Sequence, residues 1–211
     1  MTESAPPTRR ELQAAETRRL ILASARRHFA AEGYARTSLK TIAADVGVSV
    51  QTIYDSVGAK PDLVRRLNDL IDEEAQVREL AGTLSTETDP RAVVAVSARV
   101  TRRIYERCGD LVRAGFEGAR AEPELAEVAE EGGRRHRAGA QRVAARLAEL
   151  GALAQGVGAV DAAVTLAALS DIRVAFLLAD DHGLDAQAIE DWIGDRCAEA
   201  VLARSLVDKG F

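Results

Sequence analysis

The stretch that most constrains the fold is residues 37–60, TSLKTIAADVGVSVQTIYDSVGAK. Thr37 and Ser38 are candidate N-caps, because their hydroxyls can accept from the first free backbone N–H groups of a helix. Gly47 predicts a tight turn, since glycine adopts positive φ at low cost. Between them, apolar residues recur at three- and four-residue spacing and predict a short amphipathic helix: Leu39, Ile42, Ala43, Val46.

A second short helix is expected directly after that turn. Ser49 is its candidate N-cap, and its apolar positions are Val50, Ile53, Tyr54, Val57. The spacing of Ala43, Gly47 and Ile53 lets two helices cross closely, which is typical of a helix-turn-helix. The second helix of that motif presents its N-terminal side chains to the DNA major groove. On this spacing alone, an ordinary helical hairpin without nucleic acid remains the alternative.

Composition supports a helical protein. The 211 residues are 47% hydrophobic and 29% charged, as in globular proteins, and no stretch shows sustained period-two alternation. Charge is unevenly spread. Residues 1–66 hold 11 Lys and Arg against 7 Asp and Glu, a net charge of +4. The remaining residues carry a net charge of −9, which gives −5 for the whole chain. A net positive N-terminal part followed by a net negative remainder is typical of a protein that contacts nucleic-acid phosphates with its N-terminal part only.

Ahead of this stretch, a long helix is expected over Glu11–Glu32, ending at Gly33. It would complete a three-helix unit through an inner face of Leu20, Ile21, Ala25 and Phe29. Residues 1–10 predict a solvated arm, with a contact of Arg9 and Arg10 to DNA as the alternative.

Beyond the head, helical periodicity predicts Pro61–Ala81, Pro90–Cys108, Leu111–Ala119, Pro123–Leu150, Val160–Asp180 and Asp185–Leu206. Loops are expected at Gly82–Asp89 and Gly151–Ala159, an interruption at Gly109, and a turn at His182–Gly183. The chain is thus all-α, with about nine helices.

The segment Val160–Asp180 is apolar almost all round. So small a chain cannot cover such a helix by itself, which predicts a homodimer built from the last two helices; a monomer with a large core is the alternative. In the final helix, Trp192 is an aromatic anchor among small residues.

Other classes of protein find little support. No G-x-S-x-G, HExxH or P-loop pattern is present, so no enzyme, cofactor or metal site is expected. Cys108 and Cys197 lie far apart, as free thiols of a reducing cytoplasm would. The polar N-terminus predicts no signal peptide, and the apolar segment Val164–Leu178 carries Asp171 and Arg173 and is too short to span a membrane.

Residues 17–63, which include FAAEGYARTSLKTIAADVGVSVQTIYDSVGAKPDL, resemble the tetracycline-repressor (TetR) type of bacterial transcription regulators. The resemblance implies a flexible arm (1–16), a helix-turn-helix DNA-binding domain (17–62) and a ligand-binding and dimerisation domain (63–211). It further implies a homodimer on a palindromic DNA operator, and repression relieved when a small molecule binds. The alternative is a DNA-binding regulator controlled by a protein partner.

Carried over by position, the resemblance implies seven DNA-binding residues. Thr37, Ser38 and Lys60 would hold phosphate, and the groove would be faced by Ser49, Gln51, Thr52 and Tyr54. Gln51 suits a bidentate bond to adenine. Two positions depart from the family: Val50 replaces a basic residue, and Asp55 would be repelled by phosphate unless it accepts from cytosine N4 or turns toward Arg36 or Lys40.

The resemblance also implies an effector cavity among the middle helices. Its candidate lining is Ile104, Tyr105, Cys108, Phe116, His136, Val143 and Phe176. Few of these side chains are polar, so a small, largely apolar effector is expected.

Overall fold

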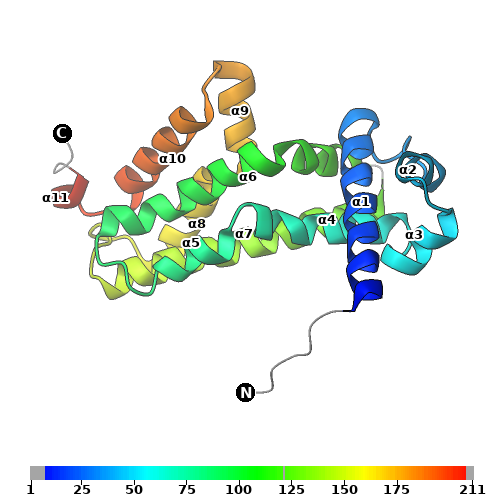
Figure 1. Ribbon diagram of the computed structural model, residues 1–211. Coiled ribbons are helices and arrows are strands. Elements are labelled where there is room, and N and C mark those ends of the chain that lie inside the picture. Colours follow the sequence, from blue (N-terminus) through cyan, green and yellow to red (C-terminus); the bar gives the residue numbers. More distant parts are fainter. Residues whose placement is uncertain (1–7, 121, 208–211) are drawn as a thin grey trace. The chain divides into compact units, whose positions relative to one another are not determined.

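The computed structural model describes residues 8–120 and 122–207 of the chain, and within them the regular structure is helical (Figure 1). The expected all-α class is confirmed. The helices are α1 (Arg9–Glu32), α2 (Leu39–Val46), α3 (Val50–Val57), α4 (Lys60–Glu74), α5 (Val77–Thr83), α6 (Pro90–Gly118), α7 (Pro123–Glu149), α8 (Ala159–Leu169), α9 (Ile172–His182), α10 (Ala186–Val201) and α11 (Arg204–Val207).

The chain divides into two compact units. The first comprises Met1–Leu70 with Asp110–Ala129, and the second comprises Ile71–Gly109 with Glu130–Phe211. Helices α4, α6 and α7 therefore each contribute residues to both units.

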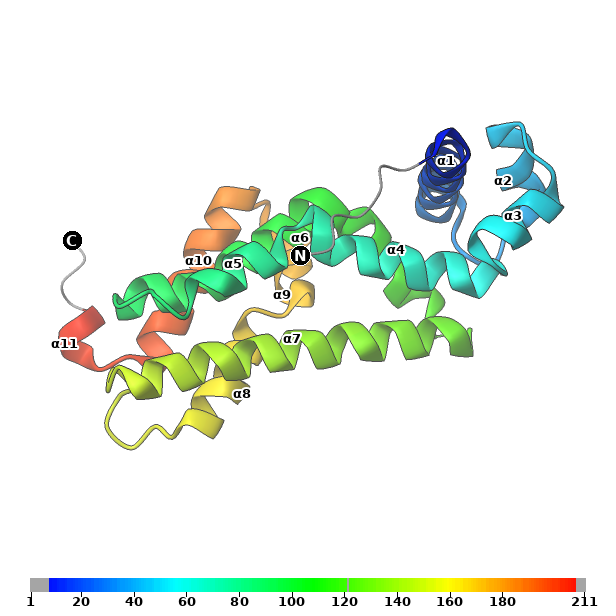
Figure 2. The ribbon, with the colours of Figure 1, turned by 60° about the horizontal axis from the view of Figure 1, so that its bottom comes forward.

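Helices α1, α2 and α3 pack on one another in the first unit (Figure 2). Ile21, Ala25 and Phe29 are buried as predicted, but Leu20 is 41% exposed and Leu22 is buried instead. The prediction for Leu20 was wrong because the three buried residues, spaced by four, place the centre of their stripe on the side of Leu22. The unit's core also contains Ile42, Ile53, Val57, Leu63 and Leu67.

Helix α1 begins earlier than expected. Its N-cap is Thr8, whose Oγ1 accepts from the Glu11 N–H at 3.3 Å, while the Glu11 carboxylate accepts from the Thr8 N–H at 2.7 Å. This reciprocal capping box makes residues 9–16 of the expected arm helical. Residues 1–7 of that arm lie outside the described residues.

The turn of the helix-turn-helix follows the sequence prediction. Ser38 caps α2 and Ser49 caps α3, each accepting from the backbone N–H three residues later. Gly47 ends α2 in the left-handed conformation, with φ of 75°. Of the two candidate caps of α2, Thr37 was therefore wrong and Ser38 right.

The single helix expected over Pro61–Ala81 is divided into α4 and α5. Gln76 separates them with φ of 53°, a left-handed conformation that costs a non-glycine residue about 1–2 kcal/mol. Arg107 of α6 donates to the Glu74 carbonyl and, over 3.3 Å, to Gln76 Oε1. The break is thus stabilised from another helix, and the local sequence carries no glycine or proline to signal it.

The interruption expected at Gly109 is absent, since α6 runs unbroken from Pro90 to Gly118. A glycine within a helix costs about 1 kcal/mol, which packing along a helix of this length can offset. A Cβ at Gly109 would lie 3.5 Å from Phe176 Cε1, so the glycine sits against an aromatic ring. Helix α7 is continuous, as expected.

The apolar helix expected over Val160–Asp180 is two helices, α8 and α9. At the break, Ser170 Oγ donates to the Leu166 carbonyl at 2.7 Å, and Thr101 Oγ1 of α6 donates to the Ser170 carbonyl at 2.7 Å. His136 Nε2 of α7 lies 2.8 Å from the Ala167 carbonyl oxygen. Side chains from α6, α7 and the C-cap of α8 thus satisfy the carbonyl groups where α8 ends.

Among the described residues, one helical stretch, Ala159–His182, is long and apolar enough to cross a membrane by length and composition alone. It contains the polar break at Ser170, and 39% of its most apolar window is buried within the protein.

The helix expected over Asp185–Leu206 is also divided. Leu202 is extended and forms an antiparallel β-bridge with Leu153, so α10 ends at Val201 and α11 follows. The core of the second unit gathers residues of α6, α7, α8, α9 and α10, with Val93, Leu147, Leu166, Ile189 and Ile193 fully buried.

Candidate nucleic-acid interface

Helix α3 divides its side chains between a buried and an exposed face. Ile53 and Val57 are 0% and 1% exposed and anchor the helix in the core of the first unit. Gln51 and Tyr54 are exposed, Tyr54 to 51%, and Thr52 is half-buried. The residues expected to face a DNA groove therefore lie on the solvent side of α3.

The N-termini of α2 and α3 share the same pattern, an N-cap serine whose hydroxyl lies beside that of a threonine three residues later. Ser49 Oγ lies 2.8 Å from Thr52 Oγ1, and Ser38 Oγ lies 2.9 Å from Thr41 Oγ1. Both serines are exposed. Free N–H groups, hydroxyls and the positive end of the helix dipole together favour an anion at such a terminus.

Thr37 lies beneath this surface. It is 2% exposed, and its Oγ1 donates to the Gly33 carbonyl at 3.0 Å. The side chain joins the end of α1 to the start of α2, and it does not share the solvent face of Ser38 and Ser49. Burial here reflects the packing of α1 on α2, which adjacent hydroxyl residues in the sequence do not reveal.

Lys60 begins α4 with its Nζ 4.0 Å from the centre of the Tyr34 ring. Burial lowers the pKa of Lys60 below its ordinary value, while the negative charge of Glu122 acts in the opposite direction. Burial and the negative charges of Glu124 and Glu122 raise the pKa of the Tyr34 phenol, while the charge of Arg65 acts to lower it.

Two arginines hold the C-terminal end of α3. Arg18 Nε of α1 donates to the Ser56 carbonyl at 3.1 Å, and Arg66 Nε of α4 donates to the Val57 carbonyl at 3.1 Å. Cations at a helix C-terminus satisfy its last carbonyls and complement its dipole. Sequence reasoning missed both residues, since no local pattern links them to α3.

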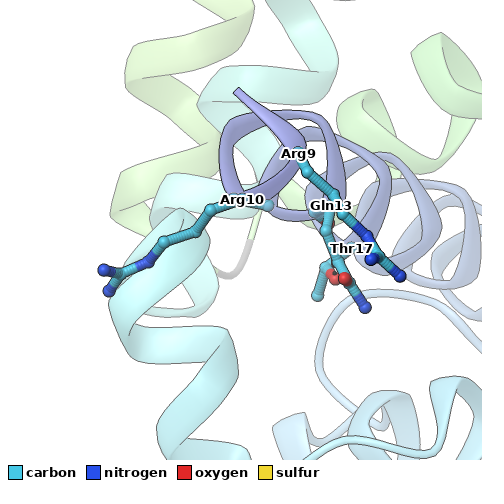
Figure 3. A pocket seen from close by; sticks show the side chains of 5 residues that line it. Arg9, Arg10, Gln13 and Thr17 are labelled. Carbon is cyan, nitrogen blue, oxygen red and sulfur yellow. Dashed lines mark hydrogen bonds between the residues drawn. The ribbon is translucent and has the colours of Figure 1, made fainter. Parts of the chain in front are cut away.

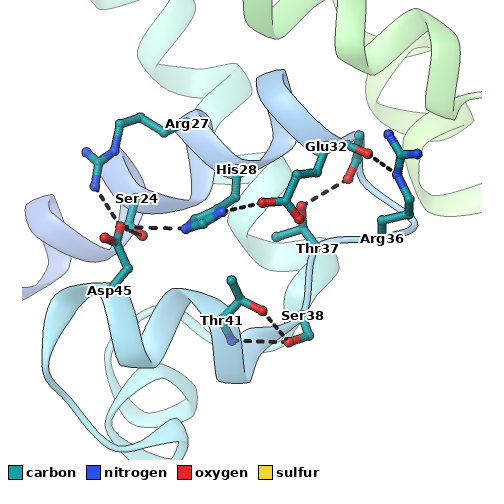
Figure 4. A network of polar contacts seen from close by, with 10 residues as sticks. Ser24, Arg27, His28, Glu32, Arg36, Thr37, Ser38, Thr41 and Asp45 are labelled. Atoms are coloured by element: carbon teal, nitrogen blue, oxygen red, sulfur yellow. Dashed lines mark hydrogen bonds and ion pairs between the residues drawn. The ribbon is translucent and has the colours of Figure 1, made fainter.

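A polar network joins α1 to α2 (Figure 4). Asp45 accepts from Ser24 Oγ at 2.6 Å and from Arg27 Nη2 at 2.7 Å, and these hydrogen bonds hold the Asp45 pKa below its ordinary value. His28 lies between two carboxylates, with Nδ1 2.9 Å from Glu32 Oε1 and Nε2 3.7 Å from Asp45 Oδ2. The angle between the two helices is thus held by polar contacts as well as by the core.

Asp55 has a partner that the sequence prediction did not name. Its Oδ1 accepts from Gln51 Nε2 at 2.8 Å, one turn earlier on α3. Arg36, one of the two expected partners, donates instead to the Glu32 carbonyl at 2.7 Å.

The first turns of α1 border an open surface pocket of about 510 Å³ (Figure 3). It is lined by Arg9, Arg10, Gln13, Ala14 and Thr17. Arg9, Gln13 and Thr17 extend to one side of the helix and Arg10 to the other. The pocket adds two positive charges to the surface of the first unit.

Comparison with known proteins agrees with this geometry. Residues 21–67, which include the second half of α1, all of α2 and α3 and the start of α4, match the family described as bacterial regulatory proteins, tetR family. The match identifies residues 21–67 as a DNA-binding domain of the TetR type. No curated protein matches its sequence.

Solved structures of TetR-type regulators share the fold across both units. SmeT of Stenotrophomonas maltophilia in a complex with triclosan aligns with a TM-score of 0.75 at 21% identity, over 90% of this chain and 94% of that one. NalD, the secondary repressor of the MexAB-OprM multidrug efflux pump in Pseudomonas aeruginosa, aligns at 0.70 and 19%, over 92% and 99%. A regulator from Saccharomonospora viridis in complex with choline aligns at 0.68 and 19%, over 90% and 100%.

The residues expected to line an effector cavity fall in both units. Phe116 is in the first unit and the other six are in the second. The rings of Tyr105 and Phe176 are 6.0 Å apart, Cys108 Sγ lies 3.4 Å from Glu74 Oε2, and Val143 is part of the packed core. His136 reaches the carbonyl end of α8, as described above, and Ile104 is half-buried.

The second unit exposes large apolar side chains on its last helices. Val160 and Val164 of α8 are 77% and 65% exposed, Leu177 of α9 is 51% exposed, and Trp192 of α10 is 38% exposed. Helices α8 and α10 are in contact. We call Val160, Val164 and Trp192 the apolar surface of α8 and α10.

Proposed function

We propose that this TetR-family transcription regulator is a repressor that binds a palindromic operator as a homodimer and is released by a small-molecule effector. The single observation that carries the proposal is the solvent face of α3, where Gln51, Thr52 and Tyr54 stand on a helix anchored by Ile53 and Val57. A recognition helix presented in this way reads base edges in the major groove.

The roles of the seven expected residues follow their positions in the structure. Ser38 and Ser49, at the exposed helix starts, would hold phosphates with the adjoining backbone N–H groups. Gln51, Thr52 and Tyr54 would face the bases, and Lys60 would add a phosphate contact. Thr37, being buried, would support the start of α2 from beneath rather than touch DNA.

The apolar surface of α8 and α10 supports a homodimer. Exposed valines and a tryptophan on two contacting helices are the kind of surface that a second copy covers. One recognition helix spans few base pairs, and a two-fold dimer reads two half-sites separated by about 34 Å, one turn of the duplex.

The effector would bind in the second unit, near Tyr105, His136 and Phe176. SmeT forms a complex with triclosan and the Saccharomonospora viridis regulator a complex with choline, which are chemically unlike molecules. The shared fold therefore does not select the effector. In this chain the aromatic pair and few polar groups favour a small, largely apolar molecule.

Selection from a randomised duplex library tests the DNA-binding proposal, followed by footprinting of the DNA upstream of the protein's own gene. A palindromic site with half-sites one helical turn apart, protected in both experiments, is the expected result. Binding of all sequences with equal affinity would contradict it.

For the effector, thermal unfolding with a panel of apolar small molecules should identify compounds that raise the melting temperature. The same compounds should then release the selected duplex in a DNA-binding measurement.

A further inference from the structure

The exposed face of α3 carries a side-chain pair of which the proposed function uses only Gln51. Gln51 Nε2 donates to Asp55 Oδ1 at 2.8 Å, and both residues are exposed. We propose that Asp55 positions the Gln51 amide and that the pair reads an adenine and a neighbouring cytosine. The inference rests on the proposed function, because it requires α3 to lie in the major groove.

The chemistry of the pair fixes the orientation of the amide. An ionised carboxylate can only accept hydrogen bonds, so the NH₂ group of Gln51 must face Asp55. The amide then offers Oε1 as an acceptor and its second N–H as a donor. Adenine presents the complementary N6 donor and N7 acceptor in the major groove, whereas guanine presents two acceptors, O6 and N7, and is rejected at Oε1.

Asp55 has a second oxygen that can accept from a base. The Gln51 amide and the Asp55 carboxylate are joined at 2.8 Å, and successive bases are about 3.4 Å apart, so the two groups can meet neighbouring base pairs. Cytosine N4 is the donor that a carboxylate accepts from in the major groove.

The negative charge of Asp55 makes this reading selective. It repels the phosphates of any duplex, so it weakens binding to every sequence. That loss is offset only where an amino group of a base faces the carboxylate. Asp55 therefore gives specificity as much by lowering the affinity for mismatched sites as by binding the matched one.

The chain contains a matched pair away from α3. On α10, Gln187 Nε2 donates to Asp191 Oδ1 at 2.9 Å with the same spacing of four residues, and both residues are exposed. If such a pair only supports its helix, removing either aspartate should have a similar effect on stability and none on sequence preference.

The experiment compares wild type with Gln51→Ala, Asp55→Ala, Asp55→Asn and Asp191→Ala. Each full-length protein selects from a randomised duplex library, and its affinity is then measured for the duplex that wild type selects and for a scrambled duplex. Gln51→Ala should relax the adenine position alone. Asp55→Ala should relax both positions and lower the affinity ratio of selected to scrambled duplex by about 5- to 150-fold. The affinity of the Asp55→Ala protein for the scrambled duplex should stay the same or increase, because a negative charge that repels phosphate has been removed.

Asp55→Asn provides the decisive comparison. Its side-chain oxygen still accepts from Gln51, so the adenine preference should persist, while the cytosine preference is lost with the carboxylate. Asp191→Ala should select the same sequence as wild type. An Asp55→Ala protein that selects an unchanged site, or that loses affinity equally for both duplexes, would overturn the inference alone. A wild type that enriches no sequence would overturn the proposed function as well.

Discussion

Lys60 carries its positive charge over an aromatic ring at the edge of the first unit. Its Nζ lies 4.0 Å from the centre of the Tyr34 ring, a cation–π contact worth about 0.5–1 kcal/mol at such sites. The contact fixes the ammonium at the start of α4. Because burial lowers the pKa of Lys60, an incoming phosphate would raise it again by favouring the charged form.

We expect Lys60→Ala to weaken binding to all duplexes and to lower the salt slope of log affinity by about one. Wild-type affinity should also fall as the pH rises toward the ordinary lysine pKa of about 10.4, because binding then requires proton uptake. Lys60→Arg should keep the salt slope and lose this part of the pH dependence. Fluorescence anisotropy at several salt and pH values measures both; an unchanged slope in Lys60→Ala would exclude the phosphate contact.

At the scale of elements, one carboxylate caps the start of α9 directly after the break from α8. Asp171 is the N-cap of α9, and its Oδ1 accepts from the Arg173 N–H at 2.9 Å. Burial acts to raise the Asp171 pKa, but hydrogen bonds from the Arg173 side chain and backbone and the charge of His136 hold it below its ordinary value. Asp171 therefore stabilises the fold in its ionised form.

Asp171→Ala should lower the free energy of unfolding by about 0.5–2 kcal/mol at neutral pH, since it removes a helix cap. A carboxyl with a depressed pKa contributes stability above its unfolded pKa of about 3.9 and loses it as the pH falls through the folded value. The difference between wild type and variant should therefore shrink in acid. Urea unfolding at pH 7 and below pH 4 measures it; a difference independent of pH would assign the loss to packing instead.

At the scale of the whole molecule, exposed apolar area and net charge point to different partners for the two units. The apolar surface of α8 and α10 belongs to the second unit, and the excess of Lys and Arg belongs to residues 1–66. A protein surface that is apolar attracts another protein surface, whereas a basic one attracts phosphate. A two-fold symmetric homodimer would then contain two copies of the basic residues 1–66.

Val164→Glu should raise the dissociation constant of the homodimer about tenfold or more, because it places an unpaired charge in the interface. Leu12→Glu is the matched control, since Leu12 is 57% exposed on α1 and outside that surface. Sedimentation at micromolar concentration should show a smaller mass for the first variant only, with helical content preserved. A wild type that sediments as a monomer would contradict the proposal.

Local chemistry made part of the fold predictable. Ser38 and Ser49 cap helices because an N-cap needs only its own hydroxyl and the next turn's N–H groups, and Gly47 adopts its positive φ for a local reason as well. The Gln51–Asp55 pair also has a local signal, the four-residue spacing, although the expected repulsion from phosphate favoured Arg36 or Lys40 as the partner of Asp55. Lys60 could be placed by position, whereas its Tyr34 contact joins residues 26 positions apart and could not.

The sequence by itself determined the all-α class, the two short helices around Gly47 and the exposed polar face of α3, because helical periodicity and capping act within one or two turns. Only the tertiary structure decided where the longer helices divide. Arg107 holds the break at Gln76, and Thr101 and His136 hold the break at Ser170, each from another helix. Tertiary packing also buried Thr37 and left Ser38 exposed, because a neighbouring helix covers one hydroxyl and not the next.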